Sequence, residues 1–507
     1  MNGMLNRTMH TVAALLAATV ALCQWNFRLD TSFRTTIVEK NVNHMHFLED
    51  DRIFLSGRVK FPGDWLMMSE RGGSCIFLNG QQDMDFPTFP QTTGGGAITP
   101  WVDGKFYVGT TTVRRMMPNG LIDPSFIAPH TSPYFSTFFY GEYHVYPDGR
   151  VIITGGHNLT DSIRGFVGRY NLIWFSNEGY LDTTRVHRKG ANCWVGRLAE
   201  LPNGQFICTS NCTEFEGKEV DWVFRVNADG TPDTTFRSGV YVGDVKSFLP
   251  LTDGRVYAGG NFQRTEASQD TLRLVRFMPD GSLDPTFNIP QFTMGGQGIS
   301  APFGPYVYRV FPWKPGYLLV AGEFRYVNGE ARSSICMIDS TGQLMPAFAG
   351  NWMGTFSASN SQITNSLIVD ILPNSDTTAI YICGAYTGYG DGEITDPTQR
   401  FVSRLLVEED TGTTSVQEVA PKTPALRLYP NPANGFVSMR YHLPGNTGAA
   451  LMVVRDVHGR TVQQFHVRGM QGAHTWDVQG LVPGVYMVEL RCEGRLEQAQ
   501  RLVVRPR

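Results

Sequence analysis

Short apolar stretches alternate with tight polar turns along most of this chain. In most of these places an Asp-Gly or Asn-Gly pair separates an apolar segment from an alternating or β-branched one, as in LTDGRVYAGG at 251–260. Such pairs tolerate the positive φ of a tight turn, so each segment is predicted to be a β-hairpin. The seven predicted hairpins lie at residues 48–57, 101–109, 146–156, 201–209, 251–260, 313–322 and 372–384.

A second phrase lies between the hairpins, and its fullest form is PDGSLDPTF at 279–287. Its copies end at residues 33, 89, 126, 185, 236, 287 and 348, the copy at 85–89 being DFPTF. A mean spacing of about 52 residues is typical of a repeat array. We expect the acid to accept hydrogen bonds from backbone N–H groups one or two residues later, and the flanking Leu and Phe to enter the space between repeats. A calcium loop would need alternating acids, which these copies lack.

Repeats of three or four short strands predict a seven-bladed β-propeller over residues 24–409, in which neighbouring blades cover each other's faces. LDTSF (29–33) has no strand of its own repeat before it, and FVSRLLVEE (401–409) has no such phrase after it. We therefore expect residues 27–33 and 401–409 to lie in one blade, a closure that removes the open edges of the array.

One repeat unit carries a family resemblance. The unit at 237–287, with LPLTDGRVYAGGNF followed by LVRFMPDGSLDPTF, resembles the delta-60 repeat of bacterial secreted proteins. The resemblance covers residues 27–409 and implies a propeller, but no particular activity. Two copies depart from the family pattern, because Arg185 replaces the aromatic residue and Met345 replaces the acid. We expect irregular blades at these copies.

The composition changes after the last repeat. Residues 410–425 are polar and lack apolar periodicity, so we interpret them as a linker. Residues 426–507 show period-2 alternation and are predicted to form a small C-terminal immunoglobulin-like β-sandwich. This block resembles the C-terminal sorting domain of the type IX secretion system. The resemblance rests on Leu428, Pro430, Asn431, Pro432, Gly435, Asp456, Gly459, Pro483, Gly484 and Tyr486.

The resemblance implies that the type IX machinery reads the tail and delivers the protein outside a Gram-negative cell. In that family the tail is commonly removed, and the remainder is released or attached to surface lipopolysaccharide. The apolar run at 11–23 predicts that residues 1–23 are a signal peptide, with a lipoprotein acylated at Cys23 as the alternative. No other segment approaches the ~18 apolar residues of a membrane helix, so we expect no transmembrane segment in the mature chain.

The cysteines do not form a regular framework. Cys193, Cys208 and Cys212 are close enough in sequence for one pair to form a disulfide in an oxidising compartment. Three of the eight cysteines lie in apolar runs and are predicted to be buried: Cys75, Cys336 and Cys383.

Few residues suggest catalysis, nucleic-acid binding or metal binding. The formal net charge of −3 offers no basic surface for nucleic acid. There is no Gly-x-Ser-x-Gly, His-Glu-x-x-His or Walker segment, so we predict neither catalytic residues nor a cofactor. His44 and His46 fall on one side of a predicted strand, but a third metal ligand is not evident. We predict no metal site, with calcium in the loop of Asp391, Glu393 and Asp396 as the alternative.

Aromatic residues supply the candidate binding site. TSPYFSTFFYGEYH at 131–144 exceeds what the repeat needs, and a comparable excursion follows near residue 386. Exposed aromatic side chains would stack on sugars or bind a protein, and burial between blades is the alternative. The candidate residues are Tyr134, Phe135, Phe138, Phe139, Tyr386 and Tyr389.

These observations predict a monomeric, secreted or cell-surface propeller that binds or adheres to a glycan or protein without catalysis. The alternative is an extracellular polysaccharide-directed enzyme whose carboxylates are assembled from different blades.

Overall fold

The computed structural model describes residues 24–64, 70–87, 89–90, 96–109, 113–128, 133–191, 193–265, 271–295, 304–357, 364–410, 426–443, 450–467, 471–492 and 495–505. The chain forms two compact units, Met1–Gly412 and Thr413–Arg507. In the described ranges the regular structure is β-strand apart from one 3-10 turn, η2 (Val102–Gly104). The predicted all-β class is confirmed.

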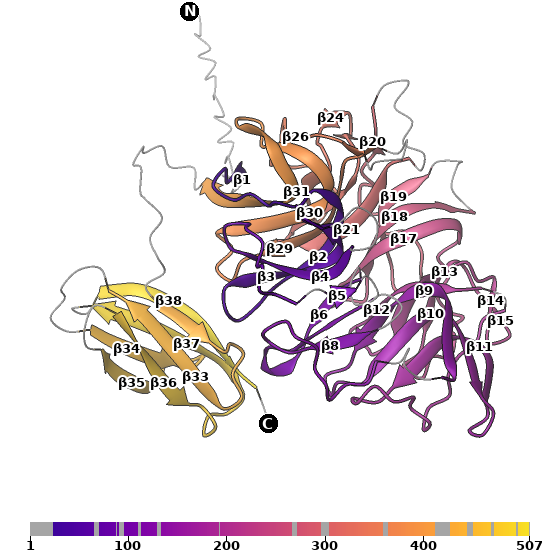
Figure 1. The fold of residues 1–507 in the computed structure, drawn as a ribbon, viewed down its shortest axis with the longest axis horizontal. Helices are drawn as coiled ribbons and strands as arrows, with labels where there is room; N and C mark the ends of the chain where they lie inside the picture. Colours follow the sequence, from indigo (N-terminus) through magenta and orange to yellow (C-terminus); the bar gives the residue numbers. More distant parts are fainter. Residues whose placement is uncertain are drawn as a thin grey trace, which may run out of the picture. The chain divides into compact units, whose positions relative to one another are not determined.

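Within these ranges, seven sheets of the first unit follow one another along the chain, from indigo to orange in Figure 1. The first sheet contains β2 (Glu39–Phe47), β3 (Arg52–Lys60), β4 (Arg71–Phe77) and β5 (Phe89–Pro90). The second contains β6 (Ile98–Pro100), β7 (Phe106–Val108) and β8 (Arg114–Met116). The third contains β9 (Phe135–Val145), β10 (Val151–Asp161) and β11 (Phe166–Phe175). The next two contain β12 (Val195–Glu200), β13 (Phe206–Ser210) and β16 (Val223–Val226); and β17 (Val240–Pro250), β18 (Val256–Arg264) and β19 (Leu272–Phe277).

The sixth sheet contains β21 (Tyr306–Pro312), β22 (Tyr317–Glu323) and β25 (Ile335–Asp339). The seventh contains β29 (Leu367–Pro373), β30 (Ala379–Gly390), β31 (Thr395–Asp410), β1 (Gln24–Leu29) and β26 (Trp352–Met353). Shorter strands of the described residues form small separate sheets. They are β14 (Glu214–Phe215) with β15 (Lys218–Glu219); β20 (Phe292–Thr293) with β23 (Tyr326–Val327) and β24 (Glu330–Ala331); and β27 (Phe356–Ser357) with β28 (Thr364–Asn365).

One strand of each sheet, called here its first strand, lies beside the first strands of the neighbouring sheets. The first strands are β2, β6, β9, β12, β17, β21 and β29. β9 contacts β12, β12 contacts β17, β17 contacts β21, and β21 contacts β29. β2 contacts both β29 and β6, and the Tyr143 hydroxyl on β9 donates a 2.8 Å hydrogen bond to the Ala97 carbonyl next to β6. The sheets therefore form a closed ring, the β-propeller that the repeats predict.

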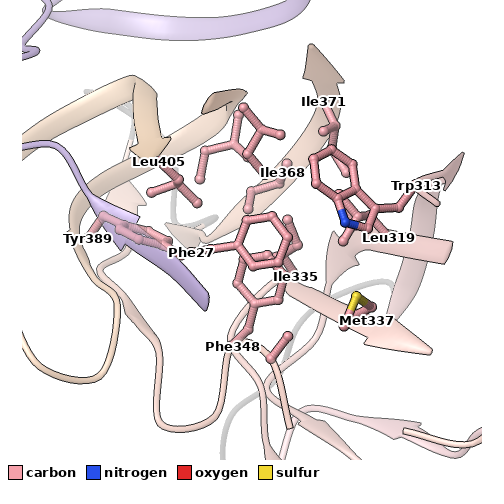
Figure 2. Close-up of a cluster of buried hydrophobic side chains, with 14 of the residues drawn as sticks. Phe27, Trp313, Leu319, Ile335, Met337, Phe348, Ile368, Ile371, Tyr389 and Leu405 are labelled. Atoms are coloured by element: carbon pink, nitrogen blue, oxygen red, sulfur yellow. The ribbon is translucent and has the colours of Figure 1, made fainter. Parts of the chain in front are cut away.

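The two ends of the propeller segment meet in the seventh sheet. β1 pairs antiparallel with β31, with Phe27 opposite Val407 and Leu29 opposite Leu405. Figure 2 shows Phe27 reaching into the buried cluster between this sheet and the sixth, where its ring stacks on Phe348 at a centroid distance of 4.3 Å. The prediction that residues 27–33 and 401–409 share one blade is confirmed.

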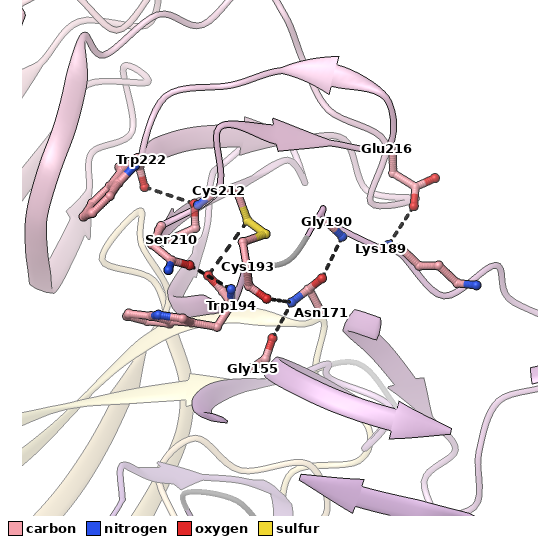
Figure 3. Close-up of a disulfide and its surroundings, with 11 residues drawn as sticks. Gly155, Asn171, Lys189, Gly190, Cys193, Trp194, Ser210, Cys212, Glu216 and Trp222 are labelled. Atoms are coloured by element: carbon pink, nitrogen blue, oxygen red, sulfur yellow. Dashed lines mark hydrogen bonds between the residues drawn. A yellow bond between two sulfur atoms is a disulfide. The ribbon is translucent and has the colours of Figure 1, made fainter. Parts of the chain in front are cut away.

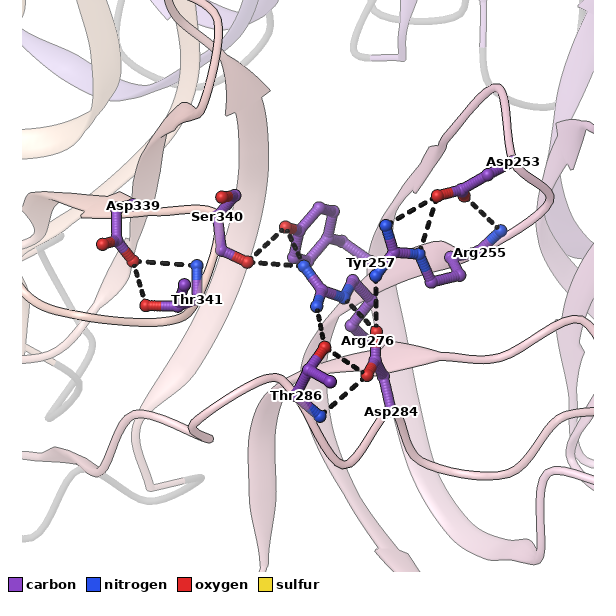
Figure 4. Close-up of polar contacts among 9 residues, drawn as sticks. All are labelled: Asp253, Arg255, Tyr257, Arg276, Asp284, Thr286, Asp339, Ser340 and Thr341. Atoms are coloured by element: carbon purple, nitrogen blue, oxygen red, sulfur yellow. Dashed lines mark hydrogen bonds and ion pairs between the residues drawn. The ribbon is translucent and has the colours of Figure 1, made fainter.

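The recurring acid fixes a turn. Asp284 Oδ1 accepts hydrogen bonds from the backbone N–H (2.8 Å) and the hydroxyl (2.6 Å) of Thr286, as Figure 4 shows. Its Oδ2 accepts from Arg276 at 2.7 Å and from Arg255 at 2.8 Å. The backbone cap recurs at Asp30, Asp123, Asp182 and Asp233. The structural role predicted for this acid is confirmed.

The same bonds join the two repeated phrases. Arg255 follows the Asp-Gly turn of its hairpin and reaches the acid of the second phrase, Asp284. Equivalent bonds join Lys105 to Asp123 and Gln205 to Asp233. The phrases recur together because the hairpin supplies the donor and the second phrase supplies the acceptor.

Each repeat is also tied to the next. Arg276 donates to the Ser340 carbonyl in the turn of the following sheet, where Figure 4 shows the two side by side. Arg115, Arg225 and Arg404 make the equivalent bond to the carbonyls of Asn177, Pro279 and Leu78. The arginine therefore joins the acid of its own sheet to the turn of the next.

The second copy of the phrase begins earlier than the sequence predicts. Asp83 Oδ1 accepts the hydrogen bond from the Asp85 N–H, so Asp83 is the capping acid. Phe86, not Phe89, is the aromatic partner, since the Arg52 guanidinium lies 5.6 Å from its ring centroid. The predicted copy at 85–89 is therefore wrong in register. DFPTF matches the residue types of the phrase, but Asp83 and Phe86 occupy the structural positions of its acid and its aromatic residue.

The irregular copies keep the backbone joint. In the fourth copy, Trp174 occupies the strand position of the arginine and Arg185 occupies the position of the aromatic residue, with the guanidinium 6.0 Å from the Trp174 ring. The cation and the ring have exchanged places. In the last copy, the Met345 N–H still donates to the Met337 carbonyl at 2.9 Å. The fourth copy differs in its side chains, and the last copy also differs in its backbone, because Phe348 has a positive φ of 64°.

One disulfide forms, between Cys193 and Cys212 (Figure 3), and Cys208 is a buried free thiol. The buried Asn171 side chain beside it donates to the carbonyls of Gly155 and Cys193. The structure thus selects one pair among the three candidate cysteines. The thiols of Cys75, Cys336 and Cys383 are buried and free, as predicted.

The second unit consists of two antiparallel sheets. One contains β32 (Leu426–Tyr429), β33 (Phe436–His442) and β36 (Gln471–Asp477). The other contains β34 (Ala450–Arg455), β35 (Thr461–Val467), β37 (Gly484–Cys492) and β38 (Arg495–Val504). Val437, Met452 and Val488 belong to one buried cluster that draws on both sheets. The unit is a β-sandwich.

The polar residues of the sorting motif fix its turns. The Val503 N–H donates to Asn431 Oδ1 at 2.9 Å, which ties the segment after β32 to β38. Asp456 Oδ1 caps its turn by accepting two backbone hydrogen bonds. The Tyr486 hydroxyl donates to the Val482 carbonyl at 2.7 Å, the arrangement of a tyrosine corner in β-sandwiches. These motif residues therefore have structural roles in the sandwich.

Candidate functional site

A cavity of about 620 Å³ lies where the first strands of the seven sheets meet. Residues of β2, β6, β9, β12, β17, β21 and β29 all line it. A well-formed cavity with convergent polar groups is the default place to look for a binding site.

β-bulges interrupt the first strands beside this cavity. Asn43, Lys246 and Tyr308 are the extra residues of the bulges in β2, β17 and β21. Glu142 and Arg197 lie in the corresponding irregularities of β9 and β12. All five line the cavity. Bulges redirect side chains, and here they accompany a polar lining on strands that otherwise bury apolar residues.

Two carboxylates of the lining are paired with cations on the cavity wall. Asp244 pairs with Lys246 within β17, and Glu142 of β9 pairs with Arg197 of β12. The second pair joins two neighbouring sheets. The lining therefore combines donors and acceptors of opposite charge rather than one strong sign.

A third carboxylate, Asp370 of β29, is buried at the wall. It lies 3.2 Å from His44 Nδ1 and, through Oδ1, 3.2 Å from Arg309 Nε. Burial opposes its ionisation, but the Arg309 guanidinium and the hydrogen bond with His44 outweigh this and hold the pKa of Asp370 below its usual value. Oδ1 has no aligned hydrogen-bond donor among the described residues, so the contact with Arg309 is an ion pair without hydrogen-bond geometry.

Two tyrosines lie where β21 begins. The rings of Tyr306 and Tyr308 have centroids 5.6 Å apart and are tilted by 30°. Lys246 Nζ lies 6.0 Å from the centroid of Tyr306. Glu323, the register partner of Tyr306, is 7% exposed, and burial raises its pKa to about 6. Sequence motifs missed all of these residues, because they occupy strand positions that no repeated phrase marks.

The predicted aromatic site is divided by the structure. Tyr134 and Phe135 line a second cavity of about 570 Å³, together with Tyr180. Phe138 and Phe139 lie on β9 and are 56% and 50% exposed. Three of these aromatics lie on β9 and Tyr134 directly precedes it; Tyr134, Phe138 and Phe139 present large exposed surfaces.

Tyr386 and Tyr389 do not belong with them. Both are fully buried in the cluster that contains Phe27 and Phe348, and the Tyr386 hydroxyl donates to Ser403 at 2.8 Å. Figure 2 shows Tyr389 in this cluster. They lie on the part of β30 that packs against the preceding sheet, so the prediction that they contact a ligand is corrected.

The residues considered for metal binding have other partners. Burial lowers the pKa of His46 to about 4, and its ring lies 4.6 Å from that of Phe106. Asp391 accepts the Leu29 N–H at 2.7 Å, and Asp396 caps its own turn as the repeat acids do. Among the described residues, no three His, Cys, Asp or Glu side chains are grouped as a metal site. No helix in the same residues is long and apolar enough to cross a membrane.

Solved structures with some likeness to the chain have low identity. One is PorZ, an essential bacterial surface component of the type-IX secretion system of Porphyromonas gingivalis, at 12% identity and a TM-score of 0.33, over 90% of this chain and 68% of that one. Another is a protein of unknown function from Bacteroides caccae, at 11% identity and a TM-score of 0.29, over 54% and 88% of the two chains. Comparison with curated proteins gives no significant match.

Two protein families match separate parts of the chain. Residues 251–287 match the family described as "Domain of unknown function (DUF5122) beta-propeller". Residues 427–505 match the "Secretion system C-terminal sorting domain". These residues coincide with the best-preserved repeat and with the β-sandwich. The chain therefore combines a β-propeller with a type IX secretion sorting domain, which indicates a secreted or outer-membrane surface protein.

Proposed function

We propose that the protein is a seven-bladed binding propeller that holds a ligand in its central cavity without changing it chemically. The observation that carries the proposal is the pairing of the cavity carboxylates, since Glu142, Asp244 and Asp370 each lie beside a cation. A neighbouring cation favours the charged form of a carboxylate, which accepts hydrogen bonds from a polar ligand. That form does not supply the proton donor that general acid catalysis needs.

Export involves both ends of the chain in this proposal. Residues 1–23 act as the signal peptide, residues 410–425 as a linker, and residues 426–507 as the element that the type IX machinery reads. The match of residues 427–505 to a sorting domain supports the last of these roles. The propeller is then delivered as a monomeric binding module.

Polysaccharide hydrolysis is the second candidate function, because one observation favours it. Burial raises the pKa of Glu323 on β22 to about 6, while Asp244 on β17 is paired with Lys246. Two carboxylates in different environments are the arrangement that glycosidases use. Glu323 is only 7% exposed and is not among the cavity-lining residues, so binding without catalysis is the better supported function.

The test uses the mature chain, residues 24–507, with a panel of polysaccharides and peptides. Affinity electrophoresis and pull-down measure retention, and mass spectrometry measures products. We expect retention without product, and at least tenfold weaker retention when Arg309→Gln removes a cation from the cavity. Arg237→Gln, a change at an exposed arginine outside the cavity, is the matched control and should have no effect. Product release that Glu323→Gln abolishes would establish an enzyme and contradict the proposal.

The exposed aromatics of β9 form a second part of the proposed binding surface. Replacing Phe138 and Phe139 with Ala should weaken retention while leaving the thermal transition nearly unchanged, since both rings are half exposed. A large loss of thermal stability would show that these rings are structural. Unchanged retention would remove them from the binding surface.

A further inference from the structure

One group of side chains at the cavity has a composition that suggests a class of ligand. The group, called here the tyrosine cluster, consists of Tyr306, Tyr308, Asp244, Lys246, Asn261 and Glu323. The two tyrosines are on β21, Glu323 ends β22, and the other residues are on β17 and β18 of the neighbouring sheet. The cluster therefore spans the junction of two sheets, where the first strands of both reach the cavity.

Several contacts hold the cluster together. The rings of Tyr306 and Tyr308 are 5.6 Å apart, and Lys246 lies 6.0 Å from the nearer one. Asp244 is opposite Asn261 in the strand register, and Asn261 is hydrogen-bonded to Tyr306. Neither tyrosine is fully buried, and Tyr308, Asp244 and Lys246 line the cavity directly.

The cluster offers several kinds of hydrogen-bonding group within one small area. At the cavity wall the Asp244 carboxylate accepts, the Lys246 ammonium donates and the Tyr308 phenol does both. The remaining members, Tyr306, Asn261 and Glu323, do not line the cavity. Beside it, Arg273 Nε has no hydrogen-bond acceptor among the described residues. A ligand that satisfies such a mixture must present several groups that each donate and accept, as hydroxyl groups do.

Charge narrows the class of ligand. Two acidic and two basic residues lie around Tyr306: Asp244 pairs with Lys246, and both Glu323 and Arg273 act electrostatically on Tyr306. This balance provides no net attraction for a polyanion or a polycation. Aromatic faces next to paired polar groups instead match a pyranose ring, which has an apolar C–H face and a rim of hydroxyls.

We infer that the tyrosine cluster is a subsite for a neutral, hydroxyl-rich carbohydrate, with Tyr308 as the ring on which a sugar lies. This inference rests on the proposed function, because it assumes that the central cavity is the binding site. It adds the class of ligand and the end of the cavity that recognises it.

The test measures retention of the mature chain by affinity electrophoresis in gels that contain one polysaccharide each. The neutral probes are dextran, laminarin, mannan and xylan, and the anionic probes are alginate and heparin. We expect retention by at least one neutral probe, reduced at least tenfold by Tyr308→Ala and largely kept by Tyr308→Phe, which preserves the ring. Tyr241→Ala changes an exposed tyrosine of β17 that does not line the cavity, and it should leave retention unchanged.

Thermal unfolding of each variant shows whether lost retention reflects lost folding. Retention by anionic probes alone, or neutral retention that a folded Tyr308→Ala variant keeps in full, overturns the inference while leaving the proposed function intact. Absence of retention by every polysaccharide and peptide overturns both. Neutral retention accompanied by hydrolysis supports the carbohydrate subsite and contradicts only the noncatalytic function.

Discussion

At the scale of single residues, the glycine in the turn of the second phrase, such as Gly281, is required for two reasons. Its φ is positive, and its position leaves no room for a Cβ atom. Gly281 has a φ of +92°, and a Cβ there would lie 2.5 Å from the backbone of Arg237 in the preceding repeat. Gly204 has a similar φ of +80°, but a Cβ there would meet nothing within 4 Å. The two glycines therefore separate the cost of backbone strain from the cost of crowding between sheets.

Gly204→Ala should lower the free energy of unfolding by about 1–2 kcal/mol, the usual cost of a left-handed Ala. Gly281→Ala should cost about 1–3 kcal/mol more, because the methyl group also displaces the neighbouring backbone. Urea unfolding of both variants measures the difference. Equal losses would mean that the close approach to Arg237 contributes nothing to stability.

The repeat acids link stability to pH. Burial works against ionisation of Asp233, but hydrogen bonds from Thr235, Arg225 and Gln205 outweigh it and lower its pKa to about 2. A carboxyl whose pKa is lower in the folded than in the unfolded protein stabilises the fold above its unfolded pKa of 3.8. That contribution is lost as the pH falls from about 4 through about 2.

Asp233→Asn should therefore lower the urea midpoint at pH 6, and the difference from the unmodified chain should narrow as the pH approaches 2. Unfolding curves at pH 6, 4, 3 and 2.5 measure this. A constant difference across this range would mean that the ion pair with Arg225 does not carry the effect.

At the scale of elements, the repeats conserve an interaction rather than a residue. Most sheets place an arginine against the acid and ring of the phrase, as Arg276 does with Asp284 and Phe287. The fourth copy exchanges the cation and the ring, and the last copy has Met337 and Met345 where the arginine and the acid stand elsewhere. An apolar pair can thus occupy the site of a buried ion pair, as other proteins also tolerate.

This substitution within the chain predicts coupling. Arg276→Met and Asp284→Met should each destabilise strongly, because each removes one partner of a buried ion pair and leaves the other charge buried with fewer partners. The double variant should be more stable than the sum of the two losses predicts, by about 0.5–3 kcal/mol, since it recreates the Met pair of the last copy.

The control combines Arg276→Met with Asp123→Met, which lie in different sheets, and its losses should add. Urea unfolding of the single and double variants gives the coupling free energy. Additive losses for Arg276 and Asp284 would contradict the interaction that the repeats imply.

The same elements explain how much the sequence could predict. Turns have fixed residue requirements, so the Asp-Gly hairpins and the capping acids revealed the strand repeat. Burial of Tyr386 and Tyr389 was not predictable, because aromatic content alone does not tell which face of β30 meets the next sheet. The spacing of eight residues between Arg276 and Asp284 recurs between Arg115 and Asp123 and between Arg225 and Asp233, a signal that could have revealed the ion pairs.

At the scale of the whole molecule, ring closure creates the candidate site. The cavity lining comes from residues as distant in sequence as His44 and Asp370, which are 3.2 Å apart. No local pattern predicts such a contact, because it exists only after the first and last sheets meet. The repeat therefore predicted the propeller, while the cavity and its tyrosine cluster required the structure.

Removing residues 426–507 tests whether the second unit is needed for export but not for the folding of the propeller. Each unit has its own buried clusters, and that of the second unit contains residues from Leu426 to Val504 only. Loss of this segment should leave the buried clusters of the propeller complete, so the truncated chain should keep its thermal transition within a few degrees. It should nevertheless remain in the periplasm, because the segment that matches a sorting domain is gone.

Cell fractionation with immunodetection measures the location of the truncated chain. The complementary control is a fusion of residues 410–507 to an unrelated exported reporter, which should reach the surface or the medium. Normal surface delivery of the truncated chain would contradict the sorting role, and loss of its thermal transition would contradict the independence of the propeller.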